Sequence, residues 1–275
     1  MKKLIIALFC PVICVVSQIE SSAETTPVRA LLITGGCCHD YFYQSKVLTF
    51  GVRNRANVEW TVVHEGAGST DFKARIYDDP EWAEGYDVVV HNECFAKVLD
   101  EAWIEKIADR HMKGLPAVVI HCAMHTYRDI KSDAWRKFLG VTSKKHEHKS
   151  NKKVINRMPD HPIMQGFPEI WTSPVDELYI IEKVWPTTKV LADGISDKKG
   201  TEGEAHAGFW INEVGDMKVF GTTFGHSNET FDDTIFLDTV TRGLLWTVGK
   251  LGPEGLPHEG YGPVKHKKRK PRKKK

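Results

Sequence analysis

The segment "VVIHCAMHTYRD" (residues 118–129) places two histidines and a cysteine within five positions. A thiol beside an imidazole can act as a nucleophile, because the imidazole can take the thiol proton. The same spacing also suits chemistry by histidine itself, with the cysteine serving only in packing. This segment alone is compatible with two interpretations. Either Cys122 is a thiol nucleophile, or His121 is the catalytic residue.

Histidines follow four of the apolar segments that predict β-strands: His39 in "TGGCCHDYF", His91 in "HNECF", His121 and His125 in "HCAMHTY", and His226 in "FGHSN". In open parallel sheets, ligands bind beyond the carboxyl ends of the strands. We therefore expect these histidines to share one polar site. Their sequence neighbours Asp40, Tyr41 and Asn92 are expected to contact a substrate there.

Imidazole supports two kinds of chemistry at such a site. Its unperturbed pKa of about 6.5 suits acid–base catalysis, and it is also the commonest metal ligand. The chain has no HExxH motif and no paired CxxC motifs, so a divalent metal is possible but none is specified. Dinucleotide, Walker and G-x-S-x-G patterns are absent too, as are motifs for specific nucleic-acid recognition.

Two adjacent carboxylates in "PVDELYI" (174–180) add a second candidate group. Asp176 and Glu177 could serve acid–base chemistry or bind sugar hydroxyls, with Tyr179 beside them as a contact. The same pair could equally be a solvated strand entry. His146 and His148 in "KHEHK" are expected to be a surface feature.

Apolar segments and amphipathic segments alternate along the first half of the chain. The pattern predicts strands at 28–34, 58–65, 86–93 and 116–122, and helices at 43–56, 100–114 and 133–140. Near-continuous apolar strands alternating with helices predict an α/β fold, doubly wound, with a mostly parallel sheet and helices on both faces. The second half predicts shorter strands and a final helix at 232–249.

The two ends of the chain differ from the folded part. Residues 1–23 have the lysines, apolar run and small residues of a signal peptide, which predicts a periplasmic or secreted protein with a domain at 24–250. Residues 251–275 read as a Pro/Gly linker and a basic disordered tail. The last 11 residues carry nine lysines and arginines, and without them the net charge falls from +2 to −7. Such a tail could attach to an anionic surface or polymer.

Four cysteines remain after the predicted cleavage. Export would permit disulfides, but adjacent Cys37 and Cys38 are awkward to bridge to each other. We expect them, with Cys94 and Cys122, to be mainly small buried residues near the site.

Several motifs together resemble the ThuA-like, or trehalose-utilisation, family. They are "LLITGGCCHDY", "VVIHCAMHTYRD", "HPIMQGFP", "DELY" and "VFGTTFGHSNETFDD" followed by "LLWTVG". The resemblance implies a fold like the class I glutamine amidotransferases and an association with 3-keto disaccharides and glycosides. Those amidotransferases carry a nucleophilic cysteine in a strand-to-helix elbow, and "VIHCAMH" puts His121 in its place.

Carried over by position, the resemblance implies a catalytic set of His39, His121, Glu177 and His226. It favours a carbohydrate-active enzyme that uses histidine and carboxylate groups for elimination or hydrolysis. The alternatives are a carbohydrate-binding module without catalysis, using aromatics such as Tyr41, Trp171 and Tyr179, and a thiol hydrolase using Cys122. The exact sugar and the oligomeric state do not follow from the sequence.

Overall fold

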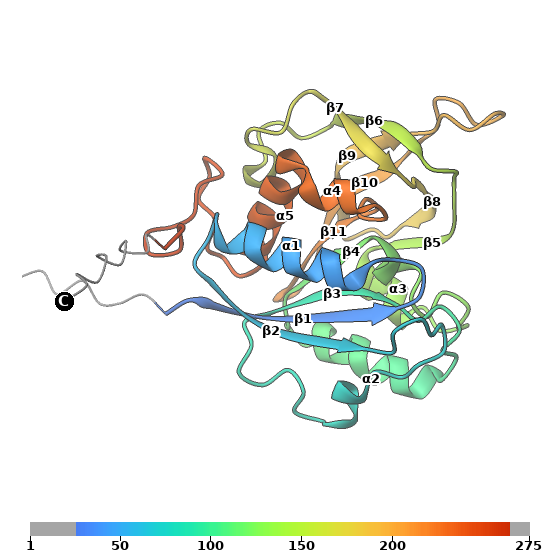
Figure 1. Ribbon diagram of the computed structural model, residues 1–275, viewed down its shortest axis with the longest axis vertical. Coiled ribbons are helices and arrows are strands. Elements are labelled where there is room, and N and C mark those ends of the chain that lie inside the picture. Colours follow the sequence, from blue (N-terminus) through green and yellow to red (C-terminus); the bar gives the residue numbers. More distant parts are fainter. Residues whose placement is uncertain (1–25, 265–275) are drawn as a thin grey trace, which may run out of the picture.

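The computed structural model describes residues 26–264 (Figure 1). The predicted signal peptide at 1–23 and the basic stretch at 265–275 lie outside these residues. Within the described part, none of the helices has the length and apolar character needed to span a membrane.

A sheet of nine strands runs through the molecule, and the five neighbouring strands at one side of it are parallel. Their spatial order is β2-β1-β3-β4-β11. The four inner strands are buried along most of their length because both faces of the sheet are covered, whereas the edge strand β2 is mostly accessible to solvent. The bounds are β1 Val28–Gly36, β2 Val58–Glu65, β3 Val88–Cys94, β4 Ala117–Ile120 and β11 Met217–Thr222.

The other four strands extend the sheet in antiparallel fashion, in the order β10-β9-β6-β7 after β11. They are β6 Ser150–Asn156, β7 Ile170–Asp176, β9 Thr188–Ile195 and β10 Ala205–Val214. A separate two-stranded sheet pairs β5 (Val141–His146) with β8 (Tyr179–Val184). This small sheet lies near the carboxyl end of β4 (Figure 1).

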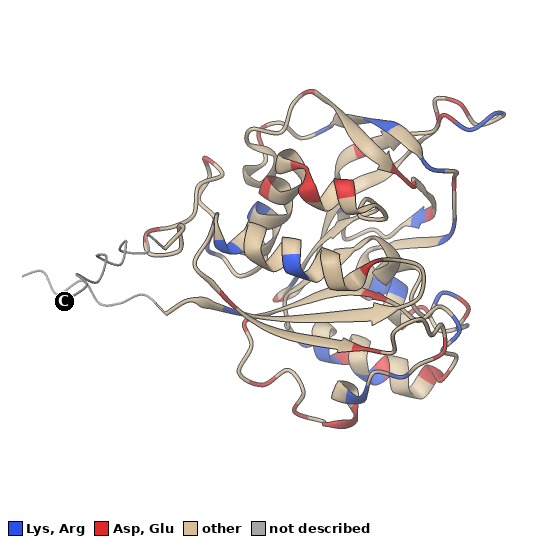
Figure 2. Ribbon diagram, in the orientation of Figure 1, with Lys and Arg blue, Asp and Glu red and all other residues tan. Residues whose placement is uncertain are grey.

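Helices cover both faces of the sheet and enclose two hydrophobic cores. The first core contains residues of α1 (Tyr41–Arg53), α4 (Asn228–Asp232) and α5 (Thr234–Thr247). The second contains residues of α2 (Glu101–Met112) and α3 (Ala134–Leu139). Short 3-10 turns lie at η1 (Arg75–Asp78), η2 (His121–Met124) and η3 (Pro162–Met164). Acidic and basic residues occur on both sides of the sheet (Figure 2).

The predicted α/β class, with a mostly parallel mixed sheet and helices on both faces, is confirmed. The predicted final helix at 232–249 is present as α5, which begins at Thr234 because Asp233 is extended and caps it by accepting from the Phe236 N–H. The short helix α4, directly before it, was not predicted. One of the shorter strands expected in the second half, β8, pairs with β5 outside the main sheet. Strands β5 and β7 were not predicted.

Candidate functional site

The chain turns sharply where β4 ends, and His121 stands at that turn. Its φ of +46° lies in the left-handed region, which residues other than glycine seldom adopt. His121 Nδ1 is 2.6 Å from the Thr223 carbonyl oxygen, which can only accept, so the proton is on Nδ1. Nε2 is then the acceptor for the Tyr179 hydroxyl at 3.1 Å. The strained turn thus fixes both the position and the tautomer of His121.

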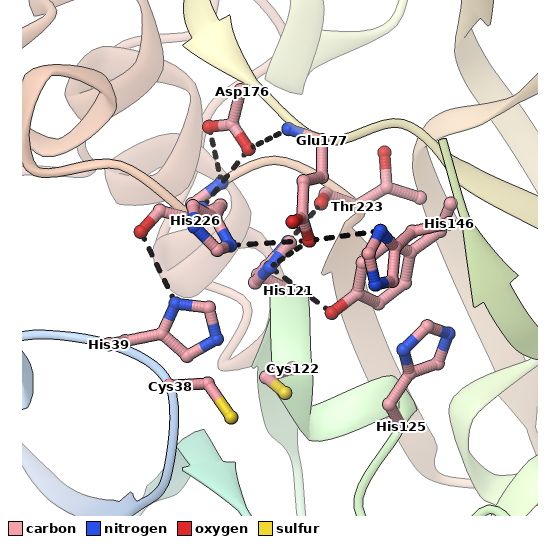
Figure 3. Close-up of polar contacts among 12 residues, drawn as sticks. Cys38, His39, His121, Cys122, His125, His146, Asp176, Glu177, Thr223 and His226 are labelled. Atoms are coloured by element: carbon pink, nitrogen blue, oxygen red, sulfur yellow. Dashed lines mark hydrogen bonds and ion pairs between the residues drawn. The ribbon is translucent and has the colours of Figure 1, made fainter. Parts of the chain in front are cut away.

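Two further histidines come from other strand ends and meet His121 (Figure 3). His39 follows β1, and its Nδ1–H donates to the His226 carbonyl at 3.2 Å. His226 follows β11 and packs its ring edge-on against both other rings, with centroids 4.6 Å from His39 and 5.4 Å from His121. One ring nitrogen of each histidine lies within 4.8 Å of one from each of the others. The side chains of His39, His121 and His226 therefore lie close together, as the sequence predicted.

Glu177 brings a carboxylate to the same place. Its Oε2 is 3.2 Å from His226 Nδ1, 3.5 Å from His146 Nδ1 and 3.7 Å from His121 Nε2. Burial acts to raise the pKa of Glu177, but His226 and His146 outweigh it and hold the pKa below its usual value. Glu177 is therefore ionised at neutral pH.

Burial holds two histidines of the cluster, His39 and His121, in the neutral form. Desolvation, with a contribution from His226, lowers the pKa of His39 to about 4. Desolvation also lowers the pKa of His121 well below its usual value, and the neighbouring His39 adds to this effect. Burial raises the pKa of Tyr179 well above normal, and Glu177 adds to it, so this phenol keeps its proton. The site thus combines the Glu177 carboxylate with the uncharged imidazoles of His39 and His121 and the Tyr179 hydroxyl.

A cavity of about 260 Å³ opens in front of this cluster. Its walls include His39, His125, Glu177, Tyr179 and His226. A second hollow of about 480 Å³ lies beside it and shares Cys38, His39 and His226 with the first. Asp40 lines this second hollow and also caps α1 by accepting from the Tyr43 N–H at 3.1 Å.

His125 forms part of the cavity wall. Its ring stacks on Tyr179 with centroids 3.7 Å apart, and its Nε2 is 3.0 Å from the Ser143 hydroxyl. Burial, with Arg128 and His146 nearby, lowers its pKa to about 2. His146 is exposed, as the sequence suggested, and it also lines the cavity. Strand β5, which was not predicted from the sequence, places His146 beside Glu177.

Three residues expected to contact substrate are buried instead. His91 is fully buried on the α2 and α3 side, with Nδ1 2.8 Å from Glu93 and Nε2 3.0 Å from His111 Nε2. Alternate residues of a strand face opposite sides of the sheet, so Asn92 instead points toward α1, 3.4 Å from Gln44. Tyr41 is 3% exposed, and burial raises its pKa well above normal.

Asp176 also differs from the expected substrate contact. It is fully buried, and its carboxylate accepts from the Thr230 hydroxyl and from three backbone N–H groups, those of Glu177, Gly225 and His226. Its role in the structure is to hold the loop that carries His226. The acid pair of the sequence thus divides into Glu177, which faces the cavity, and Asp176, which supports it from behind (Figure 3).

The four cysteines form two disulfides, which corrects the expectation of unbridged residues. Cys37 is bonded to Cys38, and Cys94 to Cys122. The φ of +83° at Cys38 bends the chain sharply at the adjacent pair, and the Cα atoms of Cys94 and Cys122 lie 5.3 Å apart, within bridging range. All four line the cavity. Cys122 has no free thiol in this arrangement.

The doubly wound sheet with a histidine in the strand-to-helix elbow places the protein in the glutamine-amidotransferase-like α/β class. Its residues 30–247 match the family model described as ThuA, trehalose utilisation. The chain belongs to this family, as the sequence motifs suggested. No curated protein sequence matches it.

Solved structures show the same fold. A ThuA-like protein from Parabacteroides merdae superposes with a TM-score of 0.64 at 19% identity, over 87% of this chain and 98% of that one. A ThuA-like protein from Bacteroides uniformis gives a TM-score of 0.61 at 15% identity, over 82% and 95%. A β-galactosidase from Bacillus circulans gives 0.53 at 12% identity, over 85% of this chain and 32% of that one. At these identities the likeness concerns the fold alone.

Proposed function

We propose that this protein is an exported carbohydrate-active enzyme that acts on 3-keto sugars or glycosides. The observation that carries the proposal is the ionised Glu177 beside neutral His39 and His121 at one cavity. The family description, trehalose utilisation, supports a sugar as substrate. The N-terminal sequence supports export, and N-terminal sequencing of the native protein should then find a start near Glu24 rather than Met1.

The chemistry begins with the ketone at C3, which acidifies the hydrogen at C2. Glu177 removes that proton, the C1–C2 double bond forms, and the C1–O bond to the leaving group breaks. Glu177 then returns the proton to the leaving oxygen, so that the products are an unsaturated keto sugar and a free alcohol. Addition of water across the double bond converts the elimination into a net hydrolysis. A single carboxylate can perform both transfers because the two positions are adjacent.

The shape of the site supports a glycoside with two parts. The cavity of about 260 Å³ and the hollow of about 480 Å³ meet at His39 and His226. A sugar ring in the first and its substituent in the second would place the bond between them beside these residues. Glu177, 3.2 Å from His226, is then close to the bond that breaks.

The structure gives less support to the two alternatives. A thiol hydrolase needs a free Cys122, but its sulfur is bonded to Cys94. A binding module would stack aromatics on the sugar, but Tyr41 and Trp171 are each 3% exposed.

The test compares two substrates that differ only at C3. A nitrophenyl 3-keto-glucoside should release nitrophenol, whereas the unoxidised nitrophenyl glucoside should not, because its C2 hydrogen is not acidic. Glu177→Gln should lower turnover of the keto substrate by about 10²–10⁴. His148→Gln, at an exposed histidine in the same segment as His146, is the matched control and should keep turnover.

Deuterium incorporation separates the possible outcomes. In D₂O, elimination followed by hydration should place deuterium at C2 of the recovered keto sugar. Direct hydrolysis would release nitrophenol without this label and would overturn the elimination step. Equal turnover of both glucosides would overturn the requirement for the ketone, and binding without turnover would establish the carbohydrate-binding module instead.

A further inference from the structure

The three clustered histidines share one arrangement of their ring nitrogens. Nδ1 of His39 faces the His226 carbonyl at 3.2 Å, and Nδ1 of His121 faces the Thr223 carbonyl at 2.6 Å. Nδ1 of His226 lies 3.2 Å from Oε2 of Glu177. Carbonyl oxygens only accept, so Nδ1 of His39 and Nδ1 of His121 keep their hydrogens, and Nε2 of each of these two rings is left with a lone pair.

This arrangement has a consequence for what the cluster can bind. Lone pairs repel an anionic oxygen, so His39 and His121 cannot stabilise the enolate of the proposed reaction by donating from Nε2. Within residues 26–264 no hydrogen-bond donor contacts Nε2 of His39, and the donor to Nε2 of His121 is the Tyr179 hydroxyl. The nitrogens are instead arranged to donate electron pairs to a cation. Imidazoles that bind metals characteristically give their other N–H to a carbonyl or carboxylate.

We propose that His39, His121 and His226 together bind one divalent transition-metal ion, for which Zn²⁺ is the first candidate. Their ring nitrogens lie within 4.8 Å of one another, and they come from three strand ends of one rigid sheet. Three protein ligands leave a coordination position open for water or substrate, as in catalytic zinc sites. The Tyr179 hydroxyl gives up its contact with His121 when the ion binds.

The donor set determines the class of metal. Three imidazoles suit Zn²⁺, Co²⁺, Ni²⁺ or Cu²⁺, whereas Mg²⁺ and Ca²⁺ prefer oxygen ligands. The catalytic role of the ion rests on the proposed function. A metal with an open coordination position would polarise the C3 ketone of the substrate and stabilise the enolate. Glu177 stays free to carry the proton through its other oxygen.

A second group of possible ligands lies next to the first. His39 and the sulfurs of Cys94 and Cys122 are also within 4.8 Å of one another. Because the two sulfurs are bonded to each other, they are not thiolates and are poor ligands. The oxidised protein should therefore bind metal through the three histidines, and a reductant should not be needed.

The test measures metal binding without substrate. The full chain, purified without a histidine tag and stripped with chelator, is titrated with Zn²⁺ by calorimetry and with Co²⁺ by visible absorption. We expect one ion per chain and the absorption band of four- or five-coordinate Co²⁺. His39→Gln and His226→Gln should each weaken binding at least about 100-fold. His125→Gln, in the same cavity but bound to Ser143, should leave the affinity within about threefold.

Several outcomes would overturn the proposal: no bound ion, unchanged affinity in both ligand variants, or binding that appears only after reduction, which would assign the ion to the cysteines. His39 and His226 are only partly buried, so their variants should fold, which circular dichroism can check. The Co²⁺ spectrum of the wild-type protein tests the ligand set even if a variant does not fold. Metal binding with no turnover of keto sugars would refute the proposed function alone, and turnover by protein shown to be metal-free would refute the catalytic role of the ion alone.

Discussion

Asp176→Asn is a sharp test of how the site is supported. The carboxylate is completely buried and accepts four hydrogen bonds that hold the His226 loop. Burial raises its pKa from 3.8 to about 6, although the hydrogen bonds from Thr230, Gly225 and neighbouring backbone groups act in the opposite direction. An asparagine has nearly the same shape as an aspartate but cannot ionise. The Asp176→Asn protein therefore lacks the contribution of this carboxyl group to the pH dependence of stability.

The sign follows from proton binding. Between pH 3.8 and about 6 the folded protein keeps the proton of Asp176, whereas the unfolded chain loses it. The free energy of unfolding contributed by this group is therefore fully present below pH 3.8 and falls as the pH rises toward 6. A difference of about two pKa units at 1.36 kcal/mol each corresponds to about 3 kcal/mol. Relative to Asp176→Asn, the wild type should lose about this much stability across the interval.

Urea denaturation followed by tryptophan fluorescence at pH 4, 5, 6 and 7 measures the effect. The quantity of interest is the wild-type free energy of unfolding minus that of Asp176→Asn, in which the titration of other groups largely cancels. Asp160→Asn, an exposed position, is the matched control and should give a difference that does not vary with pH. A wild-type advantage that stays constant or grows from pH 4 to 7 would show that the hydrogen bonds outweigh burial.

Further predictions concern the elbow, the tail and one glycine. In a keto-glycoside assay His121→Ala should lose about 10²–10⁴ in rate, because it removes a proposed ligand of the ion that would stabilise the enolate by several kcal/mol, whereas Cys122→Ala, assayed where it is shown to be folded, should stay within about tenfold; the reverse result would favour thiol chemistry. Deleting residues 265–275 should leave turnover unchanged but reduce retention on a polyanion column, most clearly at low salt, since exposed charges are screened over about 8–10 Å at physiological salt; equal retention would refute attachment through the tail. Gly36→Ala should lower unfolding free energy by more than about 2 kcal/mol, because a Cβ would lie 2.2 Å from the Cys94 carbonyl oxygen, whereas Gly68→Ala, also at positive φ but in open space, should cost less in the same urea measurement.

The strand-end rule explains how much of the site was predictable. His39, His121 and His226 each follow a strand of the parallel half, and the carboxyl ends of parallel strands meet at one edge. His91 was expected to follow its strand, but β3 continues to Cys94, so His91 lies within the strand and its side chain enters the core. The apolar run ends before His91 and does not reveal that the strand continues through the polar residues after it.

The residues that the sequence did not assign depend on long-range pairing. His146 reaches Glu177 only because β5 pairs with β8 in a second sheet, and neither its composition nor its spacing indicates that partner. The split between Asp176 and Glu177 also required the position of the His226 loop. Likewise, the bridge between Cys94 and Cys122 joins two strand ends 28 residues apart, a pairing that a cysteine count alone cannot select.

That bridge has a consequence for how the protein is produced and handled. It ties the end of β3 to the elbow after β4, directly beneath the cavity, and closes a loop that contains α2. For a loop of this length the constraint on the unfolded chain corresponds to about 3–4 kcal/mol, a large share of the roughly 5–15 kcal/mol that stabilises a typical domain. Material made in a reducing cytosol would lack this tie, and it would be a less stable protein with a looser cavity floor than the same chain matured in an oxidising compartment.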